Sequence, residues 1–352
     1  RLKEPLLLIL ACETSEMKYA VLKHLKIMIG RHPEVFQSNY TDFFLNRCDP
    51  TYVKVAKLEA LVLCATNQNV KQIMDELSYY VSLNNTESDA HVSRKAIRAL
   101  GAVAVKISAA TEVSLSHLLD FLEMRLVHVI SETFIVLKDI LRKYNNPEFC
   151  SIYLPQITQH WKMIDDDKSR VAFIWLLGEF GDSDCIKEAP YILETFINKF
   201  QSFHHTVRLE IFTSAMKLFF KRPPEMQKML GRLFQVGIGD ASHADVHDRA
   251  LFYYRLLQKD ADIARKVIGG AKSLITEFAE EESEEYKDRL FNEFNTLSII
   301  YGKPSEMFIV DVEGILGATE NDEYIEGMEE EGEDGVATSE NIERKKKPKV
   351  DK

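Results

Sequence analysis

Two histidines, His243 and His247, stand four residues apart, with Asp248 beside them. Side chains at this spacing share one face of a helix, and two histidines so placed could hold a zinc ion. A zinc site needs a third and usually a fourth ligand, and the glutamate of the HExxH pattern of zinc peptidases is missing here. The sequence therefore favours another interpretation, in which these polar residues cap the start of a helix.

The other reactive residues also lack the partners that chemistry would need. The run Asp165–Lys168 could suggest a cation site, but acidic residues gather at helix N-termini because the helix dipole favours them there. His204 and His205 likewise stand at an expected helix start. The five cysteines contain no CxxC pair, and their scatter indicates reduced thiols in a cytosolic protein: Cys12, Cys48, Cys64, Cys150 and Cys185. We therefore predict no enzyme, no bound metal and no cofactor.

Amphipathic helices account for most of the chain, and residues 46–83 show the pattern. Asp49 is a good N-cap, and Pro50 fits the first helical position, where its missing N–H costs nothing. An apolar stripe at helical spacing follows: Val53, Ala56, Ala60 and Leu63. A second amphipathic helix is expected over 69–82.

Similar helix pairs recur along the chain. Second helices of a pair are expected to begin near Ser15, Pro50, Asp89, Val129, Asp165, His204 and Ala244, at intervals of 35 to 40 residues. Other helices precede most of them, at 33–44, 69–82, 110–126, 147–161, 187–201 and 223–236. Pairs at this period are typical of HEAT and armadillo repeats, which bury their apolar faces only by stacking on one another. No useful stretch alternates with period two, so the sequence predicts an all-α fold, an α-solenoid.

The charge distribution divides the chain in two. The net charge is −11, but residues 279–352 hold 22 acidic and 9 basic side chains, which leaves 1–278 near neutrality at +2. We expect a solenoid over 1–303, with 269–303 sealing its last repeat, and a disordered acidic linker over 304–352. Neither part favours nucleic acid as a partner.

Membrane and export segments are not expected. The longest aliphatic run near the start, Leu6–Leu10, is far too short to span a bilayer, and no basic-then-apolar leader precedes it. Because the chain begins at Arg1 and is expected to be helical by Pro5, we interpret it as a piece of a longer protein.

Basic residues recur on consecutive second helices, and they are the candidate binding residues: Lys54, Lys57, Arg94, Lys95, Arg98, Lys138, Arg142 and Lys143. If these helices line one side of the solenoid, the residues form a basic strip that could bind an acidic partner or anionic lipid headgroups. The alternative is an ordinary solvated face, which the near-neutral charge of 1–278 favours.

Two short motifs lie toward the C-terminus. The run RKKKPKVDK, 344–352, resembles a basic nuclear-import signal, although the charged end of a linker is the simpler interpretation. Ile309–Glu313 approaches the clathrin-box pattern, but isoleucine replaces the leading leucine and the second bulky leucine is missing.

Several segments, in order, resemble the trunk of β-adaptins, the large subunits of heterotetrameric vesicle-coat adaptor complexes. They are DPTYVKVAKLEALVLCATNQNVKQIMDELSYYV, HVSRKAIRALGAVAVK, FIWLLGEFGD, LFFKRPPEMQKMLGRLF and DVHDRALFYYRLL. The resemblance covers nearly all of 1–303 and corresponds to the C-terminal part of a trunk. It implies a scaffold that pairs with a second large, a medium and a small subunit. It also implies a cytoplasmic complex, recruited by an Arf-family GTPase to trans-Golgi or endosomal membranes, where it selects the tails of transmembrane cargo.

Within that family the chain looks most like the β subunit of adaptor-protein complex 4, which is thought to work without clathrin. The β chains of clathrin adaptors tend to have Tyr-Trp-Arg-Leu-Leu where this chain has Tyr253-Tyr254-Arg255-Leu256-Leu257. The β subunit of a clathrin-associated complex remains the alternative. A HEAT scaffold of a phosphatase or a nuclear-import carrier is more remote, since an import carrier usually needs an acidic concave face and a phosphatase scaffold more uniform repeats.

Overall fold

Helices make up all the regular structure in the part of the chain that the computed structural model describes, residues 3–83, 90–144, 147–182, 186–240, 242–270 and 284–309. The α-helices are α1 (Lys3–Cys12), α2 (Ser15–Arg31), α3 (Pro33–Phe36), α4 (Thr51–Leu63), α5 (Val70–Leu83), α6 (Ala90–Lys106), α7 (Thr111–Glu123), α8 (Val127–Tyr144), α9 (Pro147–Ile157), α10 (Asp167–Phe180), α11 (Ala189–Asn198), α12 (His205–Lys221), α13 (Pro223–Ile238), α14 (Ala244–Lys259), α15 (Ala261–Ile268), α16 (Glu284–Asn292) and α17 (Ser298–Tyr301). Short 3-10 helices are η1 (Gln37–Phe43), η3 (Ser108–Ala110), η4 (Thr158–Met163), η5 (Phe200–Ser202) and η6 (Ser305–Met307). The predicted all-α fold is confirmed.

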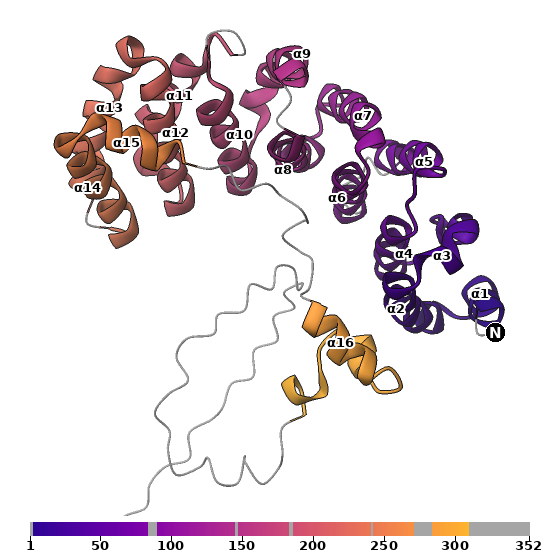
Figure 1. Cartoon of the computed structure of the whole chain (residues 1–352). Coiled ribbons are helices and arrows are strands. Elements are labelled where there is room, and N and C mark those ends of the chain that lie inside the picture. The colour runs from indigo at the N-terminus through magenta and orange to yellow at the C-terminus, as the bar shows by residue number, and fades with distance from the viewer. Residues whose placement is uncertain are drawn as a thin grey trace, which may run out of the picture. The chain divides into compact units, whose positions relative to one another are not determined.

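Two rows of helices build the repeats. The second helices, α2, α4, α6, α8, α10, α12 and α14, each pack on the next in order (Figure 1). The first helices form the other row, where α5 contacts α7, α7 contacts α9 and α11 contacts α13. Each pair is thus covered by its neighbours, as expected for an α-solenoid, whose single repeats cannot bury their apolar faces alone.

The helix starts expected from the sequence agree with the structure to within two residues, from α2 at Ser15 to α14 at Ala244. The expected cap at Asp49 is wrong, however. Pro50, in extended conformation, is the N-cap of α4, and no side chain caps that helix. Asp49 instead lies in the interior, where its carboxylate pairs with Lys57. The need to neutralise a buried lysine therefore determines the position of this side chain.

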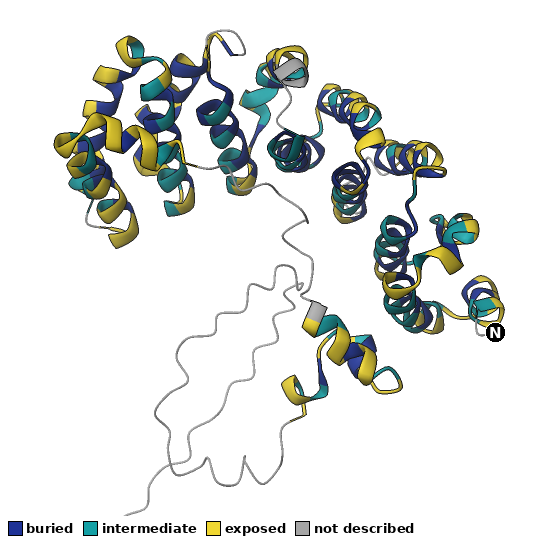
Figure 2. Ribbon diagram, in the orientation of Figure 1, coloured by how far each residue is buried: buried dark blue, intermediate teal, exposed yellow. Residues whose placement is uncertain are grey.

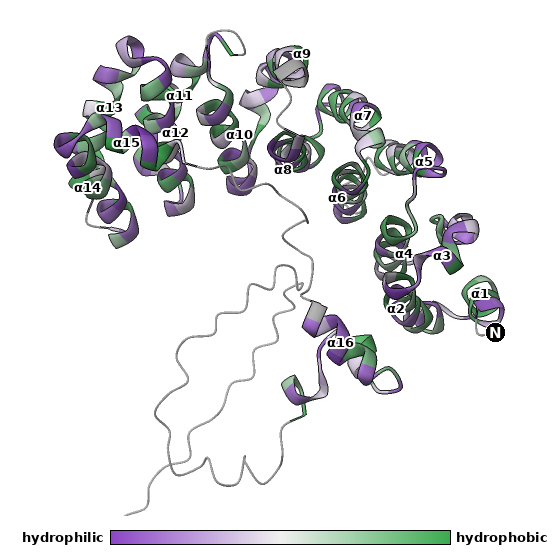
Figure 3. Ribbon diagram, viewed as in Figure 1, coloured by the Kyte–Doolittle hydropathy of each residue, from purple (hydrophilic) through white to green (hydrophobic). Residues whose placement is uncertain are grey.

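Apolar stripes face one another between the helices, and polar residues lie on the outer faces (Figures 2 and 3). Aromatic rings join neighbouring repeats in this core: the centroids of Phe134 on α8 and Phe173 on α10 are 5.4 Å apart in an edge-to-face arrangement. The ring of Trp161 is stacked with that of Phe173, with a centroid separation of 6.5 Å. Such ring pairs each add about 0.5–1.5 kcal/mol beyond the burial of their area, and here they hold one repeat to the next.

The contact between α10 and α12 depends on a glycine. A methyl group built on Gly178 would stand 2.7 Å from the Cα of Ser214 on α12. No real side chain tolerates that separation from a backbone atom, so the two helices can approach this closely only because position 178 has no Cβ.

Lysines near the ends of three second helices fasten a repeat to the one before it. Lys106 at the end of α6 donates to the carbonyl oxygen of Leu63 at the end of α4, at 3.0 Å. Lys143 near the end of α8 donates to the carbonyl of Val105 in α6, and Lys221 at the end of α12 to that of Glu179 in α10. The last carbonyls of a helix have no hydrogen-bond donor within it and carry partial negative charge. A lysine from the next repeat supplies both the donor and a positive charge.

Residues 284–301 do not seal the last repeat as expected. α17 packs on α2, and Arg31 of α2 pairs with Asp288 and lies 3.8 Å over the ring of Phe291. The ring of Phe294 meets that of His24, also on α2, at 5.0 Å. Periodicity shows that a segment is amphipathic but not which apolar surface it covers.

The chain divides into two compact units, Arg1–Pro304 and Ser305–Lys352. Only Ser305–Ile309 of the second unit is described, so the expected linker and both C-terminal motifs lie largely outside the described residues.

Candidate functional site

The predicted basic strip lies on three helices that are neighbours in the structure, α4, α6 and α8. Its members differ in what they contact. Lys57 is buried, with its Nζ 2.6 Å from a carboxylate oxygen of Asp49 and 3.2 Å from the carbonyl oxygen of Phe44. A second lysine, Lys18, approaches Asp49 at 3.8 Å. Lys57 is therefore engaged inside the repeat rather than presented to a partner.

Four more members interact with other groups of this chain: Arg98 and Lys138 through ion pairs, Arg142 through its electrostatic effect on Asp139, and Lys143 through a hydrogen bond to a carbonyl oxygen. Arg98 of α6 pairs with Glu132 of α8, whose side chain is only 5% exposed. Lys138 pairs with Asp139 at 3.2 Å. Burial raises the pKa of Asp139, while Lys138 and then Arg142 act in the opposite direction. Lys143 donates to the end of α6, as described above.

The remaining members of the strip are Lys54, Arg94 and Lys95. Arg94 is exposed and the two lysines are partly exposed. The described part of the chain gives none of the three an ion-pair partner. All three stand within the first two turns of α4 or α6, which pack against each other. Among the residues that the structure describes, these three of the eight predicted cations have no ion-pair partner, and their role as a contact surface stays a prediction.

A polar network farther along the second helices was missed by the sequence analysis. Lys217 of α12 pairs with Glu179 of α10 at 3.0 Å and lies 5.6 Å over the ring of Trp175. Glu210 accepts a hydrogen bond from Ser214 at 3.2 Å, and burial raises the pKa of Glu210. The partners Glu179 and Lys217 are 38 residues apart, which is one repeat, so opposite charges at that offset were the signal that could have revealed the pairing.

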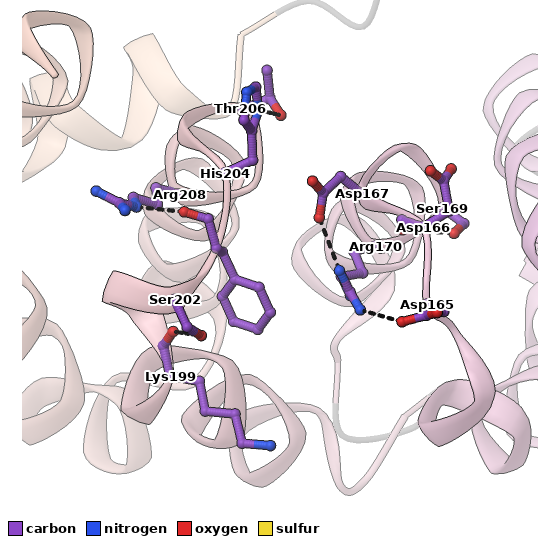
Figure 4. A network of polar contacts seen from close by, with 11 residues as sticks. Asp165, Asp166, Asp167, Ser169, Arg170, Lys199, Ser202, His204, Thr206 and Arg208 are labelled. Carbon is purple, nitrogen blue, oxygen red and sulfur yellow. Dashed lines mark hydrogen bonds and ion pairs between the residues drawn. The ribbon is translucent and has the colours of Figure 1, made fainter. Parts of the chain in front are cut away.

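The acidic run before α10 is engaged locally. Arg170 donates to Asp167 at 2.9 Å and to Asp165 at 3.1 Å (Figure 4). One guanidinium therefore holds two of the three carboxylates, and the expected role at the helix N-terminus needs no cation.

The histidines near α12 and α14 do gather. The ring centroids of His204 and His205 are 4.0 Å apart, and those of His205 and His243 are 5.2 Å apart. His247, however, lies elsewhere: its Nδ1 donates to the carbonyl oxygen of Ile238 at 2.9 Å. Among the described residues, no group of three or more His, Cys, Asp or Glu side chains could hold a metal ion.

The described cysteines are free thiols. Cys12 and Cys48 are exposed, whereas Cys64 is buried, and burial raises the pKa of its thiol to about 12. A thiol with that pKa stays protonated at neutral pH and is a poor nucleophile. The side chains of Cys150 and Cys185 lie outside the described residues.

Two rows of stacked helices present an extended surface to other molecules. Comparison with known proteins agrees: the family model described as the adaptin N-terminal region matches residues 2–261. The chain belongs to the adaptin family. This is a family of adaptor-complex chains, and the relatives named below are adaptins and complex subunits rather than enzymes.

The curated relatives are β-type adaptins. Beta-adaptin-like protein A of Arabidopsis thaliana is 41% identical over 312 residues, covering 88% of this chain and 36% of that protein. The AP-4 complex subunit beta-1 of Mus musculus is 32% identical over 305 residues, covering 86% and 40%. The AP-1 complex subunit beta of Dictyostelium discoideum is 31% identical over 311 residues, covering 88% and 32%. The β-adaptin assignment is therefore confirmed, while identities of 32% and 31% do not separate the complexes.

Two further findings bear on the adaptin fold and its extent. A structure described as a homology model of the full-length AP-3 complex in an intermediate open conformation matches with a TM-score of 0.58 at 20% identity, covering 73% of this chain and 45% of that chain. At that identity the match supports the fold. The chain spans only 36% of the length of the Arabidopsis relative. In the described residues, no helix is long and apolar enough to cross a membrane.

Proposed function

We propose that this chain is the C-terminal part of a β-adaptin trunk and acts as a scaffold in a heterotetrameric vesicle-coat adaptor complex of the complex 4 type. The observation that carries the proposal is the adaptin match over residues 2–261, on a solenoid of paired helices. Such a solenoid presents a long shaped surface, which suits a subunit whose role is to hold others in place.

The partners proposed for this scaffold are a second large subunit, a medium chain and a small chain. Through the assembled complex it would meet an Arf-family GTPase, the membrane surface and the tails of transmembrane cargo. Its place would be cytoplasmic and peripheral, on trans-Golgi or endosomal membranes. The names of the relatives, which are β subunits of the AP-1 and AP-4 complexes, support this class of assembly.

Assignment to complex 4, and to work independent of clathrin, has narrower support. The run Tyr253–Leu257 lacks the tryptophan that β chains of clathrin adaptors tend to have, and Ile309 stands where a clathrin box would begin with leucine. The alternative is the β subunit of a clathrin-associated complex, which the 31% identity to AP-1 β supports.

The experiment that tests the proposal is affinity purification of the full-length parent protein from cells, with mass spectrometry of the co-purifying chains. A second large, a medium and a small subunit of complex 4 would support it. The corresponding three subunits of another adaptor complex would contradict the assignment to complex 4 and would still support the scaffold role. A phosphatase catalytic subunit or a nuclear GTPase would contradict both.

The unpaired cations of the basic strip give a second test. Replacing Lys54, Arg94 and Lys95 by glutamate should weaken association with partner subunits or anionic membranes, because these three charges are free to act on another molecule. The matched control is reversal of Lys228, Arg255 and Lys259, exposed cations on α13 and α14 for which the described residues offer no ion-pair partner. Unchanged pull-down and vesicle co-sedimentation for the first variant would reject the strip as a contact surface.

A further inference from the structure

A cavity of about 240 Å³ lies beside the unpaired cation Lys54. The loop before α4, the first turn of α4 and the second half of α5 form it. Its lining residues are Leu45, Asn46, Arg47, Lys54, Glu76, Tyr79, Tyr80 and Leu83. Two cations, one carboxylate and several apolar side chains thus converge on one opening.

The single carboxylate of the cavity is already engaged. The Tyr80 hydroxyl accepts a hydrogen bond from the backbone N–H of Leu45 at 2.8 Å. Burial, and then the hydrogen bond with Glu76, raise the pKa of Tyr80, so the phenol stays protonated and donates to Glu76. Glu76 thus accepts a hydrogen bond from Tyr80, and no ion pair joins it to Arg47 or Lys54 among the described residues.

Arg47 and Lys54 have no ion-pair partner in the part of the chain that the structure describes. One turn further along α4, Lys57 shows the contrast, because its Nζ is held 2.6 Å from Asp49. Arg47 is exposed and Lys54 partly so. Two neighbouring positive charges with no ion-pair partner among the described residues can attract an anion from outside the chain.

The apolar side chains at the edge of the cavity, Tyr79 and Leu83, indicate which class of anionic ligand fits it. Tyr79 is 50% exposed and Leu83 42% exposed, so both offer apolar surface beside the two cations. A phosphate or lipid headgroup would meet Arg47 and Lys54 but would leave these two side chains in water. A peptide that carries a bulky apolar residue next to carboxylates satisfies both halves of the site.

We propose that this cavity is a docking site for an acidic peptide of another protein. The peptide's apolar side chain would pack on Tyr79 and Leu83, while an adjacent carboxylate would accept hydrogen bonds from Arg47 and Lys54. This inference goes beyond the scaffold role, because it places a binding site on this chain itself, and it holds whichever adaptor complex contains the chain.

The test measures binding of a fluorescein-labelled peptide, one phenylalanine flanked by glutamates, to the full chain by fluorescence anisotropy. The double variant Arg47→Glu/Lys54→Glu should weaken binding roughly a hundredfold, since two charge-assisted hydrogen bonds become repulsions. Tyr79→Ala should weaken it about fivefold or more by removing the apolar contact. The control Arg255→Glu/Lys259→Glu makes the same charge change on α14 and should leave the affinity unaltered.

Three results would overturn the proposal. They are no binding of the peptide to the unaltered chain, undiminished binding to Arg47→Glu/Lys54→Glu, and equal binding of a peptide whose phenylalanine is replaced by alanine. Phosphatidylserine-containing vesicles that bind through Arg47 and Lys54 where the peptide does not would assign the site to a lipid surface instead. Circular dichroism checks folding, and the neutral variant Arg47→Gln/Lys54→Gln repeats the measurement if the reversed charges disturb it.

Discussion

Lys57 carries a full charge into the interior of the first repeats, with a side chain only 7% exposed beside an Asp49 that is 5% exposed. A pair of this kind need not stabilise a fold relative to apolar residues of the same size. Removing Lys57 is costly, however, because Asp49 stays buried with only Lys18, 3.8 Å away, to balance its charge. A substitution at position 57 is therefore expected to lower the stability of the fold, for a reason unrelated to partner binding.

Replacing Lys57 by methionine should lower the free energy of unfolding by about 3–5 kcal/mol, measured by urea denaturation. The control is Lys54→Met on the same helix, which removes an unpaired charge and should change stability by less than about 0.5 kcal/mol. Equal effects of the two substitutions would show that the Lys57–Asp49 pair is not formed in solution.

Glu210 makes stability depend on pH. Burial raises its pKa in the folded state, against the opposing influence of Lys217, Ser214, Arg249 and Lys138. Below the ordinary pKa both states are protonated and the group has no effect. As pH rises from the ordinary pKa to the raised folded pKa, the unfolded chain ionises while the folded chain keeps its proton, so folding is increasingly penalised.

Glu210→Gln removes that penalty. We therefore compare the melting temperature of the variant with that of the unaltered chain. The variant's advantage should increase as pH rises from the ordinary glutamate pKa to the raised one, and should stay constant above it. Thermal melts at a series of pH values measure this difference. A difference that falls over the same interval would mean that the neighbouring cations outweigh burial.

At the scale of the helices, close packing decides where substitutions are tolerated. Gly178 has no room for a Cβ, since Ser214 of α12 stands in the way, whereas a Cβ on Gly231 of α13 would meet nothing within 4 Å. The same glycine-to-alanine change therefore has opposite consequences on two helices of one repeat array.

Gly178→Ala should destabilise the chain by about 1–3 kcal/mol, because α10 and α12 must move apart. Gly231→Ala should stabilise it by about 0.5–1 kcal/mol, since alanine restricts the unfolded chain and favours the helix. Chemical denaturation of both variants measures the two changes. A stabilising Gly178→Ala would contradict the close approach of these helices.

At the scale of the whole molecule, a solenoid transmits stability from neighbour to neighbour, so a segment protects only what it touches. Residues 284–301 touch α2, through Arg31 with Phe291 and His24 with Phe294. Removing these contacts should destabilise the first repeats and leave the stability of the last repeat unchanged.

The double variant Phe291→Ala/Phe294→Ala should speed amide hydrogen exchange in α2 while leaving α14 unchanged, as followed by mass spectrometry. Phe252→Ala, at an exposed position on α14, is the control and should leave α2 unaffected. Faster exchange in α14 of the double variant would restore the original expectation that this segment seals the last repeat.

The sequence by itself determined the all-α class, the repeat length and the helix starts from Ser15 to Ala244. These features are local, because apolar spacing, prolines and capping residues act within a few turns of one helix. The resemblance to β-adaptins was likewise carried by continuous segments, and the family match over residues 2–261 agrees with it.

Only the tertiary structure decided which charges are free and which surface the C-terminal helices cover. Arg98 finds Glu132 on the next repeat, 34 residues away, while Lys54 and Arg94 find no ion-pair partner among the described residues. Formal charge is the same in every case. The difference arises because a Coulomb interaction depends on the distance between two side chains, and that distance is set by how the helices pack against one another.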